Sequence, residues 1–287
     1  MESFKWHELG QTYEEIAEAF WRLSGLPETF PRDIFSACIW TLPVGVVWIS
    51  GLTGSAVAAY FPSSGRAEEL EQYVFSPLYG CLVASKGAGI IFLEKGLPAD
   101  EASFTIAHEV SHFLADYLIP RERALSKMGE RIRPVLDGER VPDVEERVDA
   151  LLCGIPLGTY VKATPRERRL SSENRADMLA LELLAPARRV LGEVFGAVAD
   201  SMQGEEGEML EGRGVLYRSN GKTVSAVFSV RTSCAEIASI LVSKYGLPAG
   251  VARWYAGYLK TKVRPAGSRG LFREWLEGPG SAKVGEL

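Results

Sequence analysis

The chain has 287 residues, of which 46% are hydrophobic and 24% charged, a composition that is ordinary for a globular protein of one large or two small domains. Its net charge of −5 gives no overall electrostatic reason to expect nucleic-acid binding. The first residues are partly acidic and contain no apolar stretch, so we expect a cytoplasmic protein without a secretory signal.

The four cysteines, Cys38, Cys81, Cys153 and Cys234, lie far apart and form no C-x-x-C pair. This spacing predicts buried thiols in a reducing compartment, and neither disulfides nor a sulfur metal site. The uncharged stretch at 34–65 is long enough to span a bilayer, but prolines and glycines interrupt it repeatedly. We therefore expect no membrane span.

The N-terminal third of the chain has signals for helices and then for strands. Apolar spacing and helix-start residues predict helices at 12–24 and 31–40. Two β-like runs, 44–50 and 55–61, are joined by glycine-containing residues and predict a hairpin. A second hairpin is predicted from strands at 79–85 and 89–93, around the glycine-rich turn at 86–89.

A helix predicted from Pro98 to about Leu118 contains the motif His-Glu-x-x-His at residues 108–112. Residues four apart lie on one helix face, about 5–6 Å apart at Cβ, so His108 and His112 can bind one zinc ion. Glu109 is placed beside the metal, where it can act as general base on a water that the metal activates.

An alternative to a metal site is a pair of surface histidines on an ordinary amphipathic helix. The helix is apolar nearly all round, which is typical of a buried helix. A buried histidine pair without a partner would cost several kcal/mol, and a metal ion removes that cost. The apolar residues that argue against surface exposure are Ile106, Ala107, Val110, Phe113 and Leu114.

The segment from residue 120 to 170 is charged and predicted to be partly helical. Helices are expected at 121–133 and 144–152, with a loop at 137–143 between them. A basic cluster, Arg166, Arg168 and Arg169, is best explained as a solvated face, with substrate contact as the alternative.

The helix predicted at 171–186 carries the candidate third ligand. Because His7 is the only other histidine, a carboxylate is the economical choice. Glu173 and Asp177 are four residues apart and share the apolar face of this helix, so Glu173 is the predicted ligand. Asp177 is predicted to accept an N–H from a ligating imidazole. The alternative for Glu173 is an acidic residue stabilised by the helix dipole.

The C-terminal part begins with a helix predicted at 187–202 and an acidic linker at 204–214. A hairpin follows at 214–230, around Ser219-Asn220-Gly221, and then two helices at 234–245 and 249–259 in a helix-turn-helix-like arrangement. The second helix carries one charged residue, Arg253, among aromatic and aliphatic side chains. This composition favours core packing or repressor binding over direct DNA contact.

The motif around His108–His112 and the segment from Glu173 to Pro186 together resemble the ImmA/IrrE metallopeptidases. The resemblance implies an α+β, gluzincin-like zinc-peptidase core, with helices around a short antiparallel sheet. It also implies that His108, His112 and Glu173 hold Zn²⁺, Mn²⁺ or a similar divalent ion, that Glu109 is the catalytic base, and that the substrate is a helix-turn-helix (XRE-type) transcriptional repressor. Sixty residues separate His112 from Glu173, more than is typical of the family, so we expect an insertion at about 120–170.

The sequence thus predicts a metallopeptidase domain at 1–203, a C-terminal hairpin and helix-turn-helix-like region at 214–262, and a tail at 263–287. Its leading function is a zinc-dependent endopeptidase that cleaves a repressor. The alternatives are a non-proteolytic, metal-containing regulatory module that binds a repressor or DNA, and a broad-specificity peptidase. The residue that stabilises the oxyanion is left open between Tyr160 and an arginine of the insertion.

Overall fold

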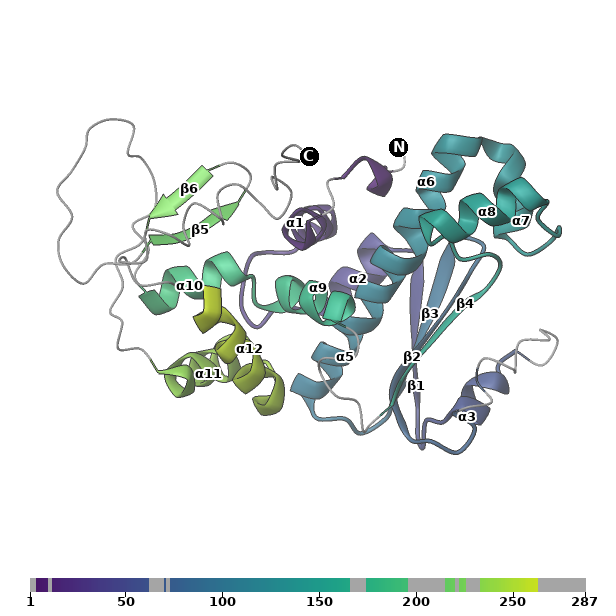
Figure 1. The fold of residues 1–287 in the computed structure, drawn as a ribbon. Coiled ribbons are helices and arrows are strands. Elements are labelled where there is room, and N and C mark those ends of the chain that lie inside the picture. Colours follow the sequence, from purple (N-terminus) through teal and green to yellow (C-terminus); the bar gives the residue numbers. More distant parts are fainter. Residues whose placement is uncertain are drawn as a thin grey trace, which may run out of the picture. The chain divides into compact units, whose positions relative to one another are not determined.

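The computed structural model describes residues 4–9, 12–61, 70, 73–165, 174–195, 215–219, 222–225 and 233–262. It is a mixed structure of many helices and a small sheet, in agreement with the α+β class (Figure 1). The chain divides into two compact units, residues 1–186 with 244–248 and residues 187–243 with 249–287. Within the described ranges, each helix is too short or too polar to cross a lipid bilayer.

The first unit contains a four-stranded sheet in the order β1-β3-β2-β4. Its central strands, β2 (Leu78–Ser85) and β3 (Ala88–Glu94), form the predicted antiparallel hairpin. The connecting residues Lys86 and Gly87 both have positive φ, as a two-residue hairpin turn of type I′ requires. β1 (Val44–Ile49) pairs in parallel with β3, so the sheet is mixed and not purely antiparallel as expected.

The predicted hairpin at 44–61 is wrong in its second half. Residues Gly54–Ala58 form a short helix, α3, in place of a strand. The side chain of Thr53 accepts the N–H of Ala56 and caps this helix, and the alanine-rich sequence favours helix over strand. β1 therefore finds its partner in β3 instead of in the next segment along the chain.

The fourth strand, β4 (Tyr160–Pro165), lies in the predicted insertion, where no strand was predicted from the sequence. It pairs antiparallel with β2 and is an edge strand of the sheet among the described residues. The register with β2 shifts by one residue between Leu78 and Gly80, which marks a β-bulge in β2.

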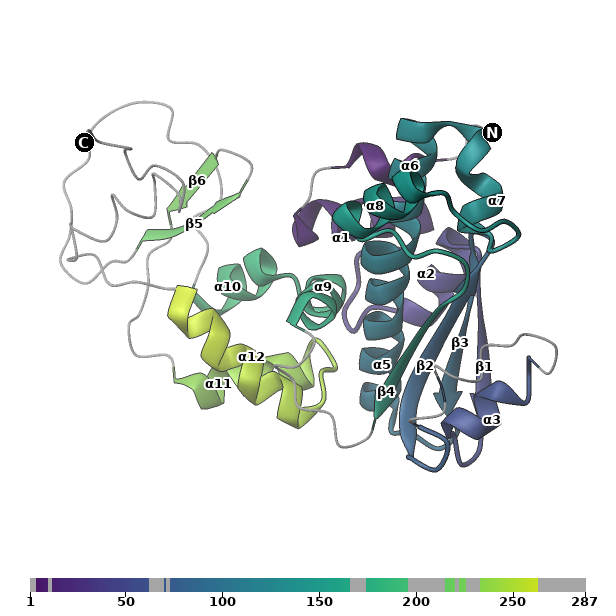
Figure 2. The same cartoon turned by 45° about the vertical axis from the view of Figure 1, so that its right-hand side comes forward.

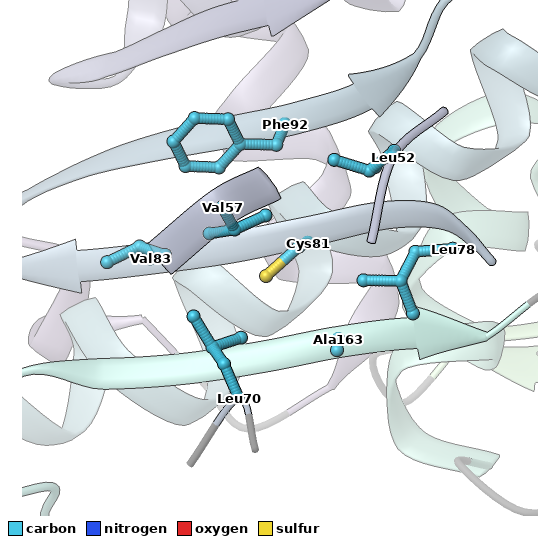
Figure 3. Packing of buried hydrophobic residues seen from close by; sticks show 8 residues of the cluster. All are labelled: Leu52, Val57, Leu70, Leu78, Cys81, Val83, Phe92 and Ala163. Atoms are coloured by element: carbon cyan, nitrogen blue, oxygen red, sulfur yellow. The ribbon is translucent and has the colours of Figure 1, made fainter. Parts of the chain in front are cut away.

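One face of the sheet packs on α3 and forms an apolar core (Figure 3). Strand residues alternate between faces, so Cys81 and Val83 of β2 and Ala163 of β4 point to this core. Its buried members are Leu52, Val57, Leu70, Leu78, Cys81, Val83, Phe92 and Ala163.

The opposite face of the sheet is covered by α5 (Ala99–His112), which lies against β2 and β3 (Figure 2). Gly89 of β3 allows this approach, because a Cβ added there would lie 3.0 Å from ring carbons of Phe113. The helix continues as a π-helical segment, η2 (Phe113–Leu118), and then as α6 (Ile119–Met128). The predicted helix to Leu118 is thus one part of a longer helical run.

Helix α9 (Asn174–Leu184) packs against α5 and against α1 (Tyr13–Ser24). The carbonyl oxygen of Leu183, near the C-terminus of α9, accepts hydrogen bonds from Trp21 Nε1 at 2.8 Å and from Arg32 at 3.0 Å. Arg32 also lies over the rings of Trp21 and Phe30. The N-terminal segment, which includes α2 (Ile34–Thr41), thus fixes the helix that carries Asp177.

The remainder of the insertion forms a small helical layer with an apolar core of its own. A buried ion pair joins Arg121 of α6 to Asp137, at 2.5 Å. Lys86 of the β2–β3 turn pairs with Glu139 and so ties this layer to the turn, and the Tyr117 hydroxyl of η2 accepts the N–H of Gly87 in the same turn. Its helical elements after α6 are η3 (Glu130–Ile132), α7 (Arg133–Leu136) and α8 (Val144–Cys153).

The second unit contains α10 (Ala187–Phe195), the hairpin strands β5 (Val215–Ser219) and β6 (Lys222–Ser225), and the packed pair α11 (Cys234–Ser243) and α12 (Ala249–Lys262). These elements confirm the helix, hairpin and helix pair expected from the sequence. Val251 and Tyr255 of α12 are buried, as a packing helix requires. The predicted linker at 204–214 and tail at 263–287 lie outside the described residues.

Candidate metal centre

The motif histidines lie on the buried helix α5 and face each other. The Nε2 atoms of His108 and His112 are 3.0 Å apart, and the two rings are nearly perpendicular. His108 is fully buried and His112 is 4% exposed, within a run from residue 104 to 114 that is buried throughout. The alternative of two surface histidines is therefore wrong.

A carboxylate lies beside the other nitrogen of each ring. His112 Nδ1 is 2.7 Å from Asp116 Oδ2, and His108 Nδ1 is 3.3 Å from Asp177 Oδ1. An ionised carboxylate only accepts hydrogen bonds, so the contact with Asp116 assigns the proton of His112 to Nδ1 and the lone pair to Nε2, while Asp177 lies at ion-pair distance from His108 Nδ1. This is the arrangement in which neighbouring carboxylates fix the tautomer and orientation of metal-binding imidazoles.

At 3.0 Å the two Nε2 atoms either share a proton in an N–H···N hydrogen bond or face a cation that lies close to both. Tetrahedral zinc with Zn–N bonds of about 2.0–2.1 Å holds its ligand nitrogens about 3.3 Å apart, near the distance found here. The buried imidazole pair therefore fits a divalent metal ion. Its donors, two neutral nitrogens, are of the kind that zinc prefers.

Glu109 follows the first histidine and is completely buried. Its Oε1 accepts a hydrogen bond of 2.6 Å from the hydroxyl of Thr164 on β4. Its Oε2 is also buried, and it has no hydrogen-bond partner among the described residues. One oxygen of this carboxylate is thus held by the protein, while the other is left to interact with a water molecule or a substrate.

Asp116 joins the histidine to a wider polar network. The hydroxyl of Tyr160 lies 3.4 Å from its Oδ2, and Arg175 of α9 lies 3.7 Å from its Oδ1. Burial acts to raise the pKa of Asp116, but the hydrogen bond from His112, the charge of Arg175 and the hydrogen bond from the Tyr160 hydroxyl outweigh it. The pKa is therefore below its ordinary value, and the group is an anion beside His112.

The predicted third ligand, Glu173, lies outside the described residues, which resume at Asn174. Within the described part of the chain, no group of three or more His, Cys, Asp or Glu residues is placed to hold a metal ion. The structure thus brings together His108, Glu109, His112 and Asp177 of the predicted site, places the predicted oxyanion candidate Tyr160 beside Asp116, and adds Asp116 and Thr164.

No family model, curated protein or solved structure matches the chain. The function is therefore inferred from the contacts within the site. A metal ion held by the two imidazoles would supply a Lewis acid next to a buried carboxylate that has one oxygen available to accept a proton. This combination is suited to hydrolysis.

Three of the arginine alternatives for oxyanion stabilisation take part in ion pairs within the described structure. Arg121, Arg133 and Arg140 of the insertion are held by Asp137, Glu130 and Glu146. The cluster at 166–169 lies outside the described residues. Tyr160 is the other predicted candidate, and its hydroxyl reaches the carboxylate that orients His112.

The thiols differ from the sequence prediction at one position. Cys38 and Cys81 are buried as expected, but Cys234 is exposed, so the prediction of a buried thiol is wrong there. Cys234 is the first residue of α11 and precedes the buried residues of that helix, Ile237, Ala238 and Leu241. The side chain of Cys153 is not among those described.

Proposed function

We propose that this chain is a zinc-dependent endopeptidase with a gluzincin-like core. The observation that carries the proposal is the buried His108–His112 pair with Nε2 atoms 3.0 Å apart, beside a Glu109 oxygen without a partner in the described structure. Resemblance to the ImmA/IrrE metallopeptidases in the same residues supports it. Mn²⁺ or another divalent ion is the alternative metal.

The residues proposed to hold the ion are His108 and His112, through Nε2, and Glu173 as the third ligand. A zinc ion held in this way supplies Lewis acidity, which polarises a substrate carbonyl and lowers the pKa of a water ligand towards 7. Asp116 and Asp177 keep the Nδ1 protons in place and thereby keep both Nε2 lone pairs directed inwards.

Glu109 is proposed to carry the proton. Its Oε2 takes a proton from the attacking water and then delivers it to the nitrogen of the leaving amine as the peptide bond breaks. Burial of the carboxylate keeps bulk water away, so the proton is transferred between defined partners.

The edge strand β4 is proposed to align the substrate. An extended peptide that pairs with an edge strand gains main-chain hydrogen bonds at any sequence. β4 carries Thr164, which touches Glu109, and Tyr160, which touches Asp116, so a peptide on this strand would pass beside the base. Tyr160 is proposed to stabilise the oxyanion, for which its hydroxyl must leave Asp116 and donate to the substrate oxygen instead.

A helix-turn-helix transcriptional repressor is the proposed substrate, and this part of the proposal comes from the family resemblance. The helix pair of the second unit, α11 and α12, is proposed to serve in repressor binding and not in direct DNA contact. In α12, Tyr258 stacks on Trp254 and on Tyr255 within a packed aromatic group, which leaves little of the helix for reading a DNA groove.

The test is cleavage by the purified, zinc-loaded chain. A purified helix-turn-helix repressor from the same genome is incubated with the wild-type protein, with and without a chelator, and with Glu109→Gln. We expect cleavage that the chelator stops and that the variant reduces at least about 100-fold, because the proton acceptor is lost. Zinc content, measured by mass spectrometry of the native protein, should stay at one ion per chain in Glu109→Gln.

A His112→Ala variant is the matched control, since it should lose both zinc and cleavage. Persistent cleavage by Glu109→Gln would overturn the assignment of the base. Zinc binding at one ion per chain with no cleavage of repressor, or of a quenched fluorescent peptide library, would favour the non-proteolytic regulatory module.

A further inference from the structure

The hydrogen bond between Thr164 and Glu109 lies where solvent does not compete with it. Thr164 is 2% exposed, Glu109 is fully buried, and Thr164 Oγ1 lies 2.6 Å from Glu109 Oε1. Hydrogen bonds to a carboxylate are short and about twice as strong as those between neutral groups. Loss of a partner inside a protein leaves the remaining group unsatisfied at a substantial cost.

The sheet is built to receive the carboxylate at this point. Gly80 of β2 is the direct cross-strand partner of Thr164. A Cβ added to Gly80 would lie 2.8 Å from Glu109 Oε1 and 2.6 Å from Cγ2 of Thr105, closer than real contacts allow. The Glu109 side chain thus occupies the space that any other residue at position 80 would fill.

The β-bulge between Leu78 and Gly80 sets which residues face the helix. Leu78 and Cys81 are three apart in sequence but share the core on the α3 side of the sheet (Figure 3). In an unbroken strand, residues three apart would point to opposite faces. The extra residue at the bulge restores Leu78 to the core while Gly80 faces Glu109, so the bulge permits both contacts.

We propose that Thr164 is a positioning residue that holds Glu109 in one orientation, with Oε1 fixed to the sheet and Oε2 presented to the reacting water. This inference rests on the proposed function for its catalytic consequence. A carboxylate without this anchor can rotate about its terminal torsion, which is broad for glutamate. It would then present the accepting oxygen in the right place for only part of the time.

The contact is tested first without metal and without substrate. Urea midpoints of the full chain in chelator are measured for the wild type, Thr164→Val, Glu109→Ala and the double variant. We expect Thr164→Val to lower the midpoint in the wild-type background and to leave it nearly unchanged in the Glu109→Ala background. Equal shifts in the two backgrounds would overturn the inference.

The catalytic consequence is tested on the zinc-loaded chain with a quenched fluorescent peptide that the wild type cleaves. Thr164→Val should lower kcat about 10- to 100-fold and leave KM and zinc content unchanged, since the β4 backbone and the ligands are intact. Thr164→Ser, which keeps the hydroxyl, should retain most of the activity. Ser111→Ala is the matched control, because that buried hydroxyl donates only to the Ala107 carbonyl of its own helix.

The outcomes separate the two proposals. Absence of any zinc-dependent cleavage by the wild type would overturn the proposed function and, with it, the catalytic role of Thr164. Cleavage by Thr164→Val at the wild-type kcat would overturn the positioning role alone, and so would a loss in Thr164→Ser as large as that in Thr164→Val.

Discussion

Asp116 Oδ2 lies 2.7 Å from His112 Nδ1, although the two residues are separated by the first turn of a π-helical segment. Such π-helical segments are frequent at functional sites. The contact makes the surroundings of the two histidines alike, because Asp177 holds the corresponding position beside His108. Each of the two histidines thus has a carboxylate of its own, one from η2 and one from α9.

Removal of either carboxylate charge should weaken metal binding. We expect Asp116→Asn and Asp177→Asn each to lower zinc affinity about 10- to 100-fold, because an amide holds the Nδ1 proton less firmly than an anion does. Competition titrations against a chromophoric zinc chelator measure this effect. Glu130→Gln, in an exposed ion pair with Arg133, is the matched control and should leave affinity unchanged. Unchanged affinity in both aspartate variants would exclude the proposed ligand geometry.

The motif helix was predictable because its signals are local. One helical turn contains His108, Glu109 and His112. The apolar residues around them indicated that this turn is buried, as it is in the structure. Asp177 was predictable from the i, i+4 spacing on a second apolar helix. Asp116 has the same i, i+4 spacing from His112, which is an equally local signal, but this contact was not predicted.

The features that were not predicted from the sequence depend mainly on contacts between distant segments. Thr164 reaches Glu109 only because β4 pairs with β2, and no local pattern in a charged insertion predicts that pairing. Residues 55–61 read as a strand because short apolar runs are ambiguous between strand and helix. The cap formed by Thr53 decides in favour of a helix there. Alternation in Tyr160–Pro165 was the available signal for β4.

Substitution of Gly80 should be costly although the residue lies in an ordinary strand. We expect Gly80→Ala to lower the free energy of unfolding by roughly 1–3 kcal/mol and to displace the Glu109 carboxylate, because the new Cβ overlaps Thr105 and Glu109. Gly45→Ala in β1 is the matched control, since no atom lies within 4 Å of its added Cβ. Urea denaturation should show a change within about 0.5 kcal/mol for that control. Similar changes in the free energy of unfolding for both variants would contradict the close packing of Gly80 against Glu109 and Thr105.

The buried ion pair in the insertion should contribute to stability in a way that the exposed pairs do not. Asp137→Ala leaves the guanidinium of Arg121 without this partner at 3% exposure, so we expect a loss of about 3 kcal/mol in the free energy of unfolding. Glu130→Ala, which breaks the exposed pair with Arg133, should have no measurable effect. Thermal and urea denaturation of the two variants measure the contrast, and equal losses would show that the Arg121–Asp137 pair is not buried in solution.

The thiols give a test of the structure that needs no substrate or metal. Burial raises the pKa of Cys38 to about 12, so about one thiol in ten thousand is ionised at pH 8. Burial, and after it the charge of Glu109, raises the pKa of Cys81 well above its ordinary value. Cys234 is exposed, and iodoacetamide at pH 8 should therefore label Cys234 while leaving Cys38 and Cys81 unmodified. Peptide mapping by mass spectrometry reads out each site, with the chain in 8 M urea as the control in which all three react. Rapid labelling of Cys81 in the folded chain would show that the β2 strand opens readily. The contacts of Glu109 with Gly80 and Thr164 would then not be rigid enough to position a base.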